Sequence, residues 1–179
     1  MSIDVIDHLA GIAPGSALDE LRRRRPRTRE YAQRSYEALF GQARPDLLAL
    51  AAFVATLHEQ PAVARFYAER LDPGLAESIR AEAEAARTTG PYGAYREPEL
   101  AAENVLGPVY QAAGPFGERM NAAFTHAHLL VLRPREASPE ALEALAKAGW
   151  STDEIVTVAQ LVAFLAFQIR VISALRGLR

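Results

Sequence analysis

The chain has 179 residues, half of them apolar, with a formal net charge of −2 and an isoelectric point near 6.1. This length suffices for one domain with a buried core, and the balanced charge gives no global field that would attract nucleic acid or anionic lipid. The absence of cysteine excludes disulfide bonds, thiolate zinc sites and thiol-based peroxide reduction. We therefore expect one domain over 1–179, with no metal, no cofactor and no nucleic-acid partner.

The apolar residues recur with a helical period and give no convincing strand, which predicts an all-α fold. Serine, proline and glycine signals divide the pattern into successive helices. The expected helices span 18–25, 28–40, 45–58, 61–71, 75–87, 115–132, 139–149 and a long last helix that opens at the capping box 151–154. The longest expected loop covers 88–96, and a helical stretch from 98 is broken at 107–108.

The N-terminal segment carries acidic residues and no long apolar run, so it does not resemble a secretory signal. The apolar run 155–175 is interrupted by Gln160, Gln168 and Arg170, which a membrane span tolerates poorly. We interpret this run as the buried helix of a soluble cytoplasmic protein that has no membrane partner.

The sequences LEALAKAGWSTDEIV over 142–156 and FLAFQIR over 164–170 resemble the C-terminal helical hairpin of the carboxymuconolactone decarboxylase / alkylhydroperoxidase D-like superfamily. The segment 44–71 is similar to the helix pair that carries the redox motif in that superfamily. The resemblance implies an alkylhydroperoxidase D-like helical bundle over 41–179, with 1–40 as an N-terminal helical extension. It also implies a homo-oligomer, either a trimer or a hexamer.

The redox motif of that superfamily, C-x2-C-x3-H, would fall at Gln60, Val63 and Tyr67 of this chain. The glutamate of the proton relay would fall at Leu48. Since both thiols, the histidine and the glutamate are replaced, the resemblance implies a cysteine-free branch without redox activity.

Five polar side chains are candidates for a pocket. His58 either caps its helix or acts as an acid–base group, and Tyr67 is either a core side chain or a phenol donor to a ligand. His128 lies on a polar stripe of its helix and is a further pocket candidate. Gln160 and Gln168, which we expect on one arc of the last helix, form either an inter-subunit hydrogen-bond ladder or a pocket wall.

Two other features have open interpretations, and His126 has a single one. The arginine run 22–27 either binds phosphates or forms a solvated ion-pair cluster. Tyr92 and Tyr95 belong either to a lid or to a loop packed by its own tyrosines. His126 aligns with Arg119 and Arg133, which predicts a solvated face.

Two functions remain open at this point. The first is an oligomeric binding or partner protein without redox activity, paired with itself or with a cysteine-bearing relative. The second is a cofactor-free enzyme, similar to a decarboxylase or isomerase, that uses histidine and tyrosine acid–base groups on a small carbonyl or carboxylate compound.

Overall fold

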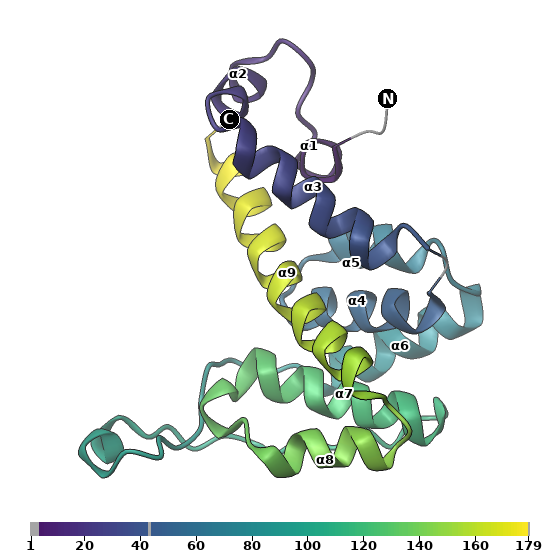
Figure 1. Ribbon diagram of the computed structural model, residues 1–179, viewed down its shortest axis with the longest axis vertical. Coiled ribbons are helices and arrows are strands. Elements are labelled where there is room, and N and C mark those ends of the chain that lie inside the picture. Colours follow the sequence, from purple (N-terminus) through teal and green to yellow (C-terminus); the bar gives the residue numbers. More distant parts are fainter. Residues whose placement is uncertain (1–3, 43, 179) are drawn as a thin grey trace.

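Helices account for every regular element in the part of the chain that the computed structural model describes, residues 4–42 and 44–178. The all-α prediction is therefore confirmed. The elements in Figure 1 are α1 (Val5–Ala10), α2 (Ala17–Arg23), α3 (Pro26–Phe40), α4 (Pro45–Leu57), α5 (Pro61–Ala68), α6 (Pro73–Ala86), η1 (Pro98–Glu103), α7 (Gly117–Leu132), η2 (Pro134–Glu136), α8 (Pro139–Lys147) and α9 (Thr152–Gly177).

Serine and proline start most of these helices. The side chains of Ser16, Ser138 and Ser151 each accept a hydrogen bond from a backbone N–H in the first turn of the following helix, and Ser151 completes a capping box with Glu154. Pro26 starts α3 two residues earlier than predicted, because its fixed φ suits a first helical position. The short helix α1 was not predicted.

The long helix α9 crosses the whole molecule diagonally (Figure 1). It packs against α7 and α8 near its start, against α4 in its middle, and against α1 and α3 near its end. Nearly all of α4 is buried, because α5, α6, α7 and α9 surround it. One cluster of buried apolar side chains extends from Val5 in α1 to Leu175 in α9.

An arm formed by residues 88–116 leaves the helical body between α6 and α7, with η1 near its tip (Figure 1). The loop predicted at 88–96 is therefore the first part of a longer excursion. An isolated antiparallel bridge between Gly93 and Val105 holds its two branches together.

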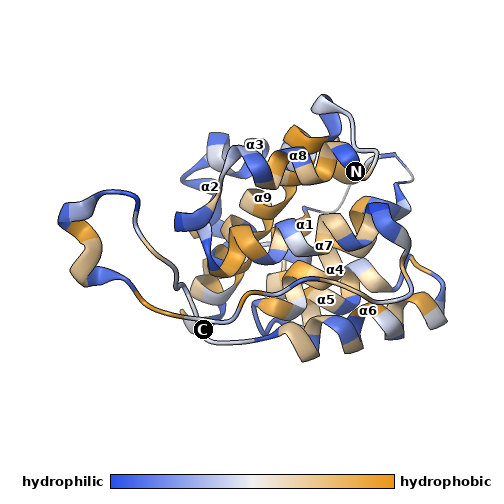
Figure 2. Ribbon diagram, turned by 90° about the horizontal axis from the view of Figure 1, so that it is seen from below, coloured by the Kyte–Doolittle hydropathy of each residue, from blue (hydrophilic) through white to orange (hydrophobic). Residues whose placement is uncertain are grey.

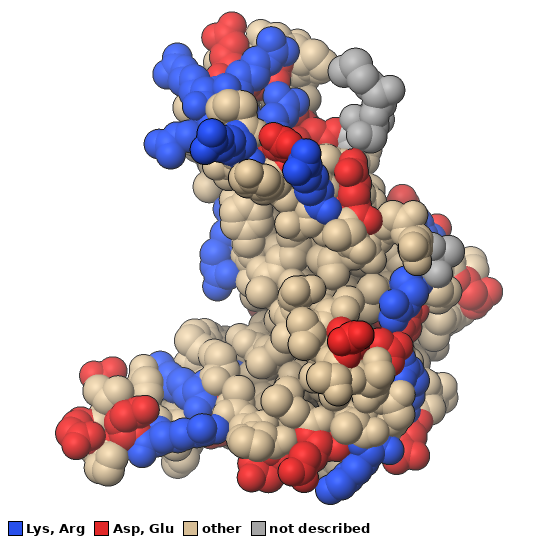
Figure 3. Space-filling view, in the orientation of Figure 1, with Lys and Arg blue, Asp and Glu red and all other residues tan. Residues whose placement is uncertain are grey.

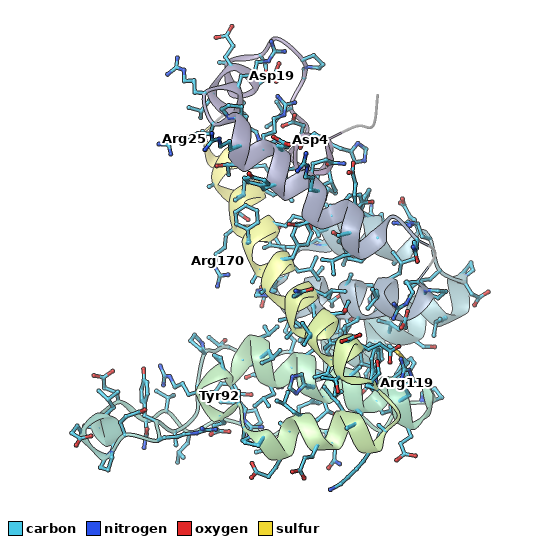
Figure 4. All side chains as sticks on the ribbon, viewed as in Figure 1. Asp4, Asp19, Arg25, Tyr92, Arg119 and Arg170 are labelled. Carbon is cyan, nitrogen blue, oxygen red and sulfur yellow. The ribbon has the colours of Figure 1, made fainter. Side chains whose placement is uncertain are left out.

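The N-terminal helices are joined by largely buried ion pairs, and Figure 4 labels two of their carboxylates, Asp4 and Asp19. Arg22 pairs with Asp4 and Asp7, while Arg29 pairs with Asp7 and with Asp19. The arginine run 22–27 is thus partly an internal ion-pair cluster, and Arg22 holds α2 against α1.

The outward face of α9 is largely uncovered. The helix is long and apolar enough to cross a membrane by length and composition, yet less than half of its most apolar stretch is buried. Figure 2 shows hydrophobic ribbon along this helix. An all-round apolar helix needs cover on all sides, so its outer side lacks a partner within the described chain.

Candidate functional site

Tyr67 and Gln168 form a buried polar pair between α5 and α9. Both side chains are fully inaccessible, and the phenol O–H of Tyr67 donates to Oε1 of Gln168 over 2.9 Å. The ring of Phe40 lies 4.8 Å from that of Tyr67 and seals it. Burial raises the pKa of Tyr67 above its ordinary value, so the phenol stays neutral and acts as a hydrogen-bond donor rather than a base. The Nε2 of Gln168 has no hydrogen-bond partner in the described chain.

His58 lies at the C-cap of α4, as its sequence position indicates. Its side chain is half-buried, and its Nε2 is buried without a hydrogen-bond partner among residues 4–42 and 44–178. Burial, and then the charge of Arg170, lower the pKa of His58 below 6.5. The ring is therefore neutral at pH 7.

His128 lies elsewhere in the core, on α7. Its Nε2–H donates to the backbone carbonyl of Ala86 over 3.0 Å, and its ring lies 4.6 Å from the ring of Tyr110. The Tyr110 hydroxyl donates to Glu82 over 2.6 Å. Burial lowers the pKa of His128. The Nε2–H of His128 is thus used in a structural hydrogen bond near the base of the arm.

The two positions at which the resemblance would place thiols, Gln60 and Val63, have different surroundings. Val63 is fully buried in the core, whereas Gln60 is the half-buried N-cap of α5 and borders a groove. The groove has a volume of about 550 Å³ and lies between α4, α5 and α6. Its floor is formed by small apolar side chains such as Ala52 and Ala64, and its rim carries three arginines and three glutamates: Arg65, Arg80, Arg87, Glu59, Glu77 and Glu84.

Only two of the candidate pocket residues therefore meet, namely Tyr67 and Gln168. Gln160 is exposed on the outward face of α9, away from the buried Gln168. Eight positions along a helix place two side chains about 80° apart, so the single arc expected from the sequence is wrong. His58, His128 and Gln160 lie in three different parts of the structure. Gln60, one of the positions of the redox motif, borders the groove.

His126 is the polar residue that the sequence misplaced. It is buried, where a solvated face was predicted, and burial lowers its pKa. Together with Asn121 and Thr125 it lines a cavity of about 400 Å³ beneath α8 and the returning branch of the arm. The cover comes from segments distant in sequence, so the alignment of His126 with arginines on its own helix gave no sign of it.

Tyr92 is buried at the base of the arm, and its hydroxyl donates to the carbonyl of Pro108 over 2.8 Å. Tyr95 lies under the guanidinium of Arg135 at 4.3 Å. These contacts agree with a loop packed by its own tyrosines. Among the described residues no three histidine, aspartate or glutamate side chains converge as a metal ion would require.

Comparisons with known proteins give no neighbour for this chain: no family model, no curated protein and no solved structure matches it.

Proposed function

We propose that this chain is a cysteine-free, non-redox member of the carboxymuconolactone decarboxylase / alkylhydroperoxidase D-like superfamily, which acts in the cytoplasm as an oligomeric binding or partner protein. The outward face of α9 is the observation that carries this proposal. Six of its exposed residues form one stripe with alternate spacings of four and three positions: Val156, Gln160, Ala163, Phe167, Arg170 and Ala174. This spacing places the six side chains on one line along the helix, where a second helix can pack against the apolar ones.

Large apolar side chains on this face remain in water in the single chain. Val156 is 51% exposed and Phe167 is 40% exposed. Arg170 donates to the carbonyl of Ala166 in its own helix and has no acidic partner within the described residues. Self-assembly would cover the apolar side chains and supply polar groups for Arg170.

The arrangement of the polar candidates also supports a role without catalysis. Tyr67 is sealed by its bond to Gln168, and His128 is bound to a backbone carbonyl. Both side chains are buried, and neither lines the groove between α4, α5 and α6 or the cavity beneath α8. The α8–α9 hairpin supports the family assignment, since Gly149 adopts a left-handed φ of 90° before the Ser151 capping box.

The proposal is tested by the molar mass in solution, measured by light scattering. We expect at least twice the chain mass of 19.5 kDa, and a Phe167→Glu variant that is monomeric and folded. Leu75→Glu is the matched control, because Leu75 is 38% exposed but lies on α6. A wild-type protein that is monomeric at tens of micromolar refutes self-assembly, and binding to lipid vesicles by the same face would assign α9 to a membrane instead.

The groove at Gln60 favours a second candidate, the cofactor-free enzyme acting on a small carboxylate compound. Arg65 on its rim makes no salt bridge in the described chain, so it can pair with a ligand carboxylate. In that case Glu59 would supply an acid–base group in place of His58 and Tyr67, since a hydrogen bond from Arg80 lowers the pKa of the Glu77 carboxyl. A dicarboxylate that raises the thermal midpoint of wild type, but not of Arg65→Gln, would support this candidate.

A further inference from the structure

The arm carries the most exposed large apolar side chains of the described structure. Leu106 is 98% exposed and Val109 is 76% exposed. Both lie on the branch that returns from η1 to α7, and two perpendicular views show the arm projecting clear of the helices (Figures 1 and 2). An aliphatic side chain gains free energy when it leaves water, so these two residues favour a partner.

Hydrogen bonds fix the shape of the arm. Gly93 and Val105 exchange backbone hydrogen bonds of 2.7 and 3.2 Å, and the Tyr92 hydroxyl donates to the carbonyl of Pro108 over 2.8 Å. The backbone that carries Leu106 is therefore held in place by these hydrogen bonds. A segment ordered before binding has less conformational entropy to lose when it binds.

The arm, the outward side of α9 and the α2–α3 end border a hollow in the molecular surface, here called the concave face (Figure 3). A groove that fits an aliphatic side chain lies at the end of this face away from the arm. It has a volume of about 200 Å³ and lies where α2 and α3 meet α9. Leu21, Phe167 and Val171 supply apolar walls, and Arg25 stands beside them. Figure 4 shows Arg25 and Arg170 projecting on the side of α9 that the arm also borders.

Figure 3 shows acidic side chains at the outer end of the arm, with basic side chains behind them, and mostly basic side chains at the α2–α3 end. The tip of the arm carries Glu97, Glu99 and Glu103, and the opposite end carries the exposed Arg24, Arg25 and Arg27. None of these six side chains forms a salt bridge within residues 4–42 and 44–178. The arm thus offers three carboxylates and an exposed aliphatic side chain, and the α2–α3 end offers three guanidinium groups and an apolar groove. These complementary features lie at opposite ends of the same chain.

We infer that a second copy of this chain occupies the concave face, with its α9 antiparallel to the first and each arm laid on the α2–α3 end of the other copy. This inference rests on the proposed self-assembly and adds its geometry. A two-fold axis near the middle of α9 brings both acidic arms to both arginine clusters at once, while a parallel pairing would bring like charges together. Leu106 of each copy then enters the groove beside Phe167 of its partner.

The size of the contact requires the arm. A helix of 26 residues is about 39 Å long, and a seam about 10 Å wide along it covers about 400 Å². A stable interface buries roughly 800 Å² on each partner. The seam of α9 alone supplies about half of this area, so the arm and the groove that receives it are needed for a stable dimer.

Cross-linking tests this geometry without background, because the natural chain has no cysteine. A Glu99→Cys variant mixed with an Arg25→Cys variant and oxidised should give a disulfide-linked dimer. The same Glu99→Cys variant mixed with Lys147→Cys should not, since the exposed Lys147 lies on α8, away from the arginine cluster. An oligomer of the expected mass that fails to cross-link, or that cross-links equally with Lys147→Cys, overturns the two-fold arrangement and leaves the proposed function standing.

Charge exchange gives a second measurement. Reversing Arg24, Arg25 and Arg27 to glutamate, or reversing the three glutamates of the arm to arginine, should weaken self-association by about tenfold or more. Combining both reversals in one chain should restore it, because each copy again offers opposite charges. Equal weakening in the combined variant overturns the inference.

Discussion

Replacing Tyr67 by phenylalanine is the sharpest test of the buried pair. The substitution keeps the ring that packs on Phe40 and removes only the donor of the 2.9 Å bond to Gln168. Oε1 of Gln168 would then be buried without a donor, beside an Nε2 that already has no partner in the described chain. An orphaned buried polar group costs about 1–3 kcal/mol, so we expect Tyr67→Phe to lower the free energy of unfolding by about 2 kcal/mol.

The companion change, Gln168→Met, removes both polar atoms of the amide, Oε1 and Nε2, and keeps the approximate length of the side chain. It leaves the Tyr67 hydroxyl without an acceptor but also removes the unpaired Nε2, so its cost should be lower, about 1 kcal/mol. The double variant leaves no unpaired polar group in this part of the core. We expect it to be about as stable as the wild type, which gives a favourable coupling of roughly 2–3 kcal/mol between the two positions.

Urea unfolding followed by circular dichroism at 222 nm measures these differences. All variants must be compared at one protein concentration, because self-association would add to the apparent stability. If Tyr67→Phe costs less than about 0.5 kcal/mol, water reaches the Gln168 amide and the pair is not sealed. If the double variant loses the sum of the two single losses, the side chains do not interact and the reasoning fails.

Two further predictions concern pH and the N-terminal ion pairs. Burial lowers the folded-state pKa of His58, His126 and His128, so the unfolded chain binds more protons than the folded chain below about pH 6.5. The midpoints of urea unfolding should therefore fall as the pH goes from 7.5 to 5.5. A rise over this range would contradict the prediction. Arg22→Met leaves Asp4 and Asp7 with Arg29 as their remaining cation, so it should cost about 2–3 kcal/mol in thermal or urea unfolding, the value of lost hydrogen bonds to charged groups. Arg34→Met, at an exposed pair, should cost less than about 1 kcal/mol, and equal losses would refute the importance of burial.

Local chemistry made much of the fold predictable from the sequence. Ser16, Ser138 and Ser151 cap the helices that they were expected to cap, because each stands before an apolar period and offers an oxygen to the first free N–H groups. Helix α1 escaped prediction because six residues are too few to show a period. The arm escaped because its shape depends on long-range bonds such as that from Tyr92 to Pro108.

The candidate site was less predictable, because burial is decided by what covers a helix and not by the helix itself. Gln168 and Gln160 are the same residue type on one apolar helix, yet α5 covers the first and the second is exposed. His126 is covered by α8 and the arm, which sequence periodicity on α7 does not reveal. The partnership of Tyr67 with Gln168 joins residues 101 positions apart, beyond the reach of any local pattern.

The diagonal course of α9 also decides when this protein can fold during its synthesis. Every helix that α9 packs against precedes it in the chain. Its last turn reaches back to the first helix, where Arg176 donates to the carbonyl of Leu9 over 2.7 Å across 167 positions. On the ribosome the earlier helices therefore emerge with their inner apolar faces uncovered. The core stays incomplete until α9 has emerged. Such long-range closure slows folding, so the core should become complete only once α9 has been made, rather than helix by helix.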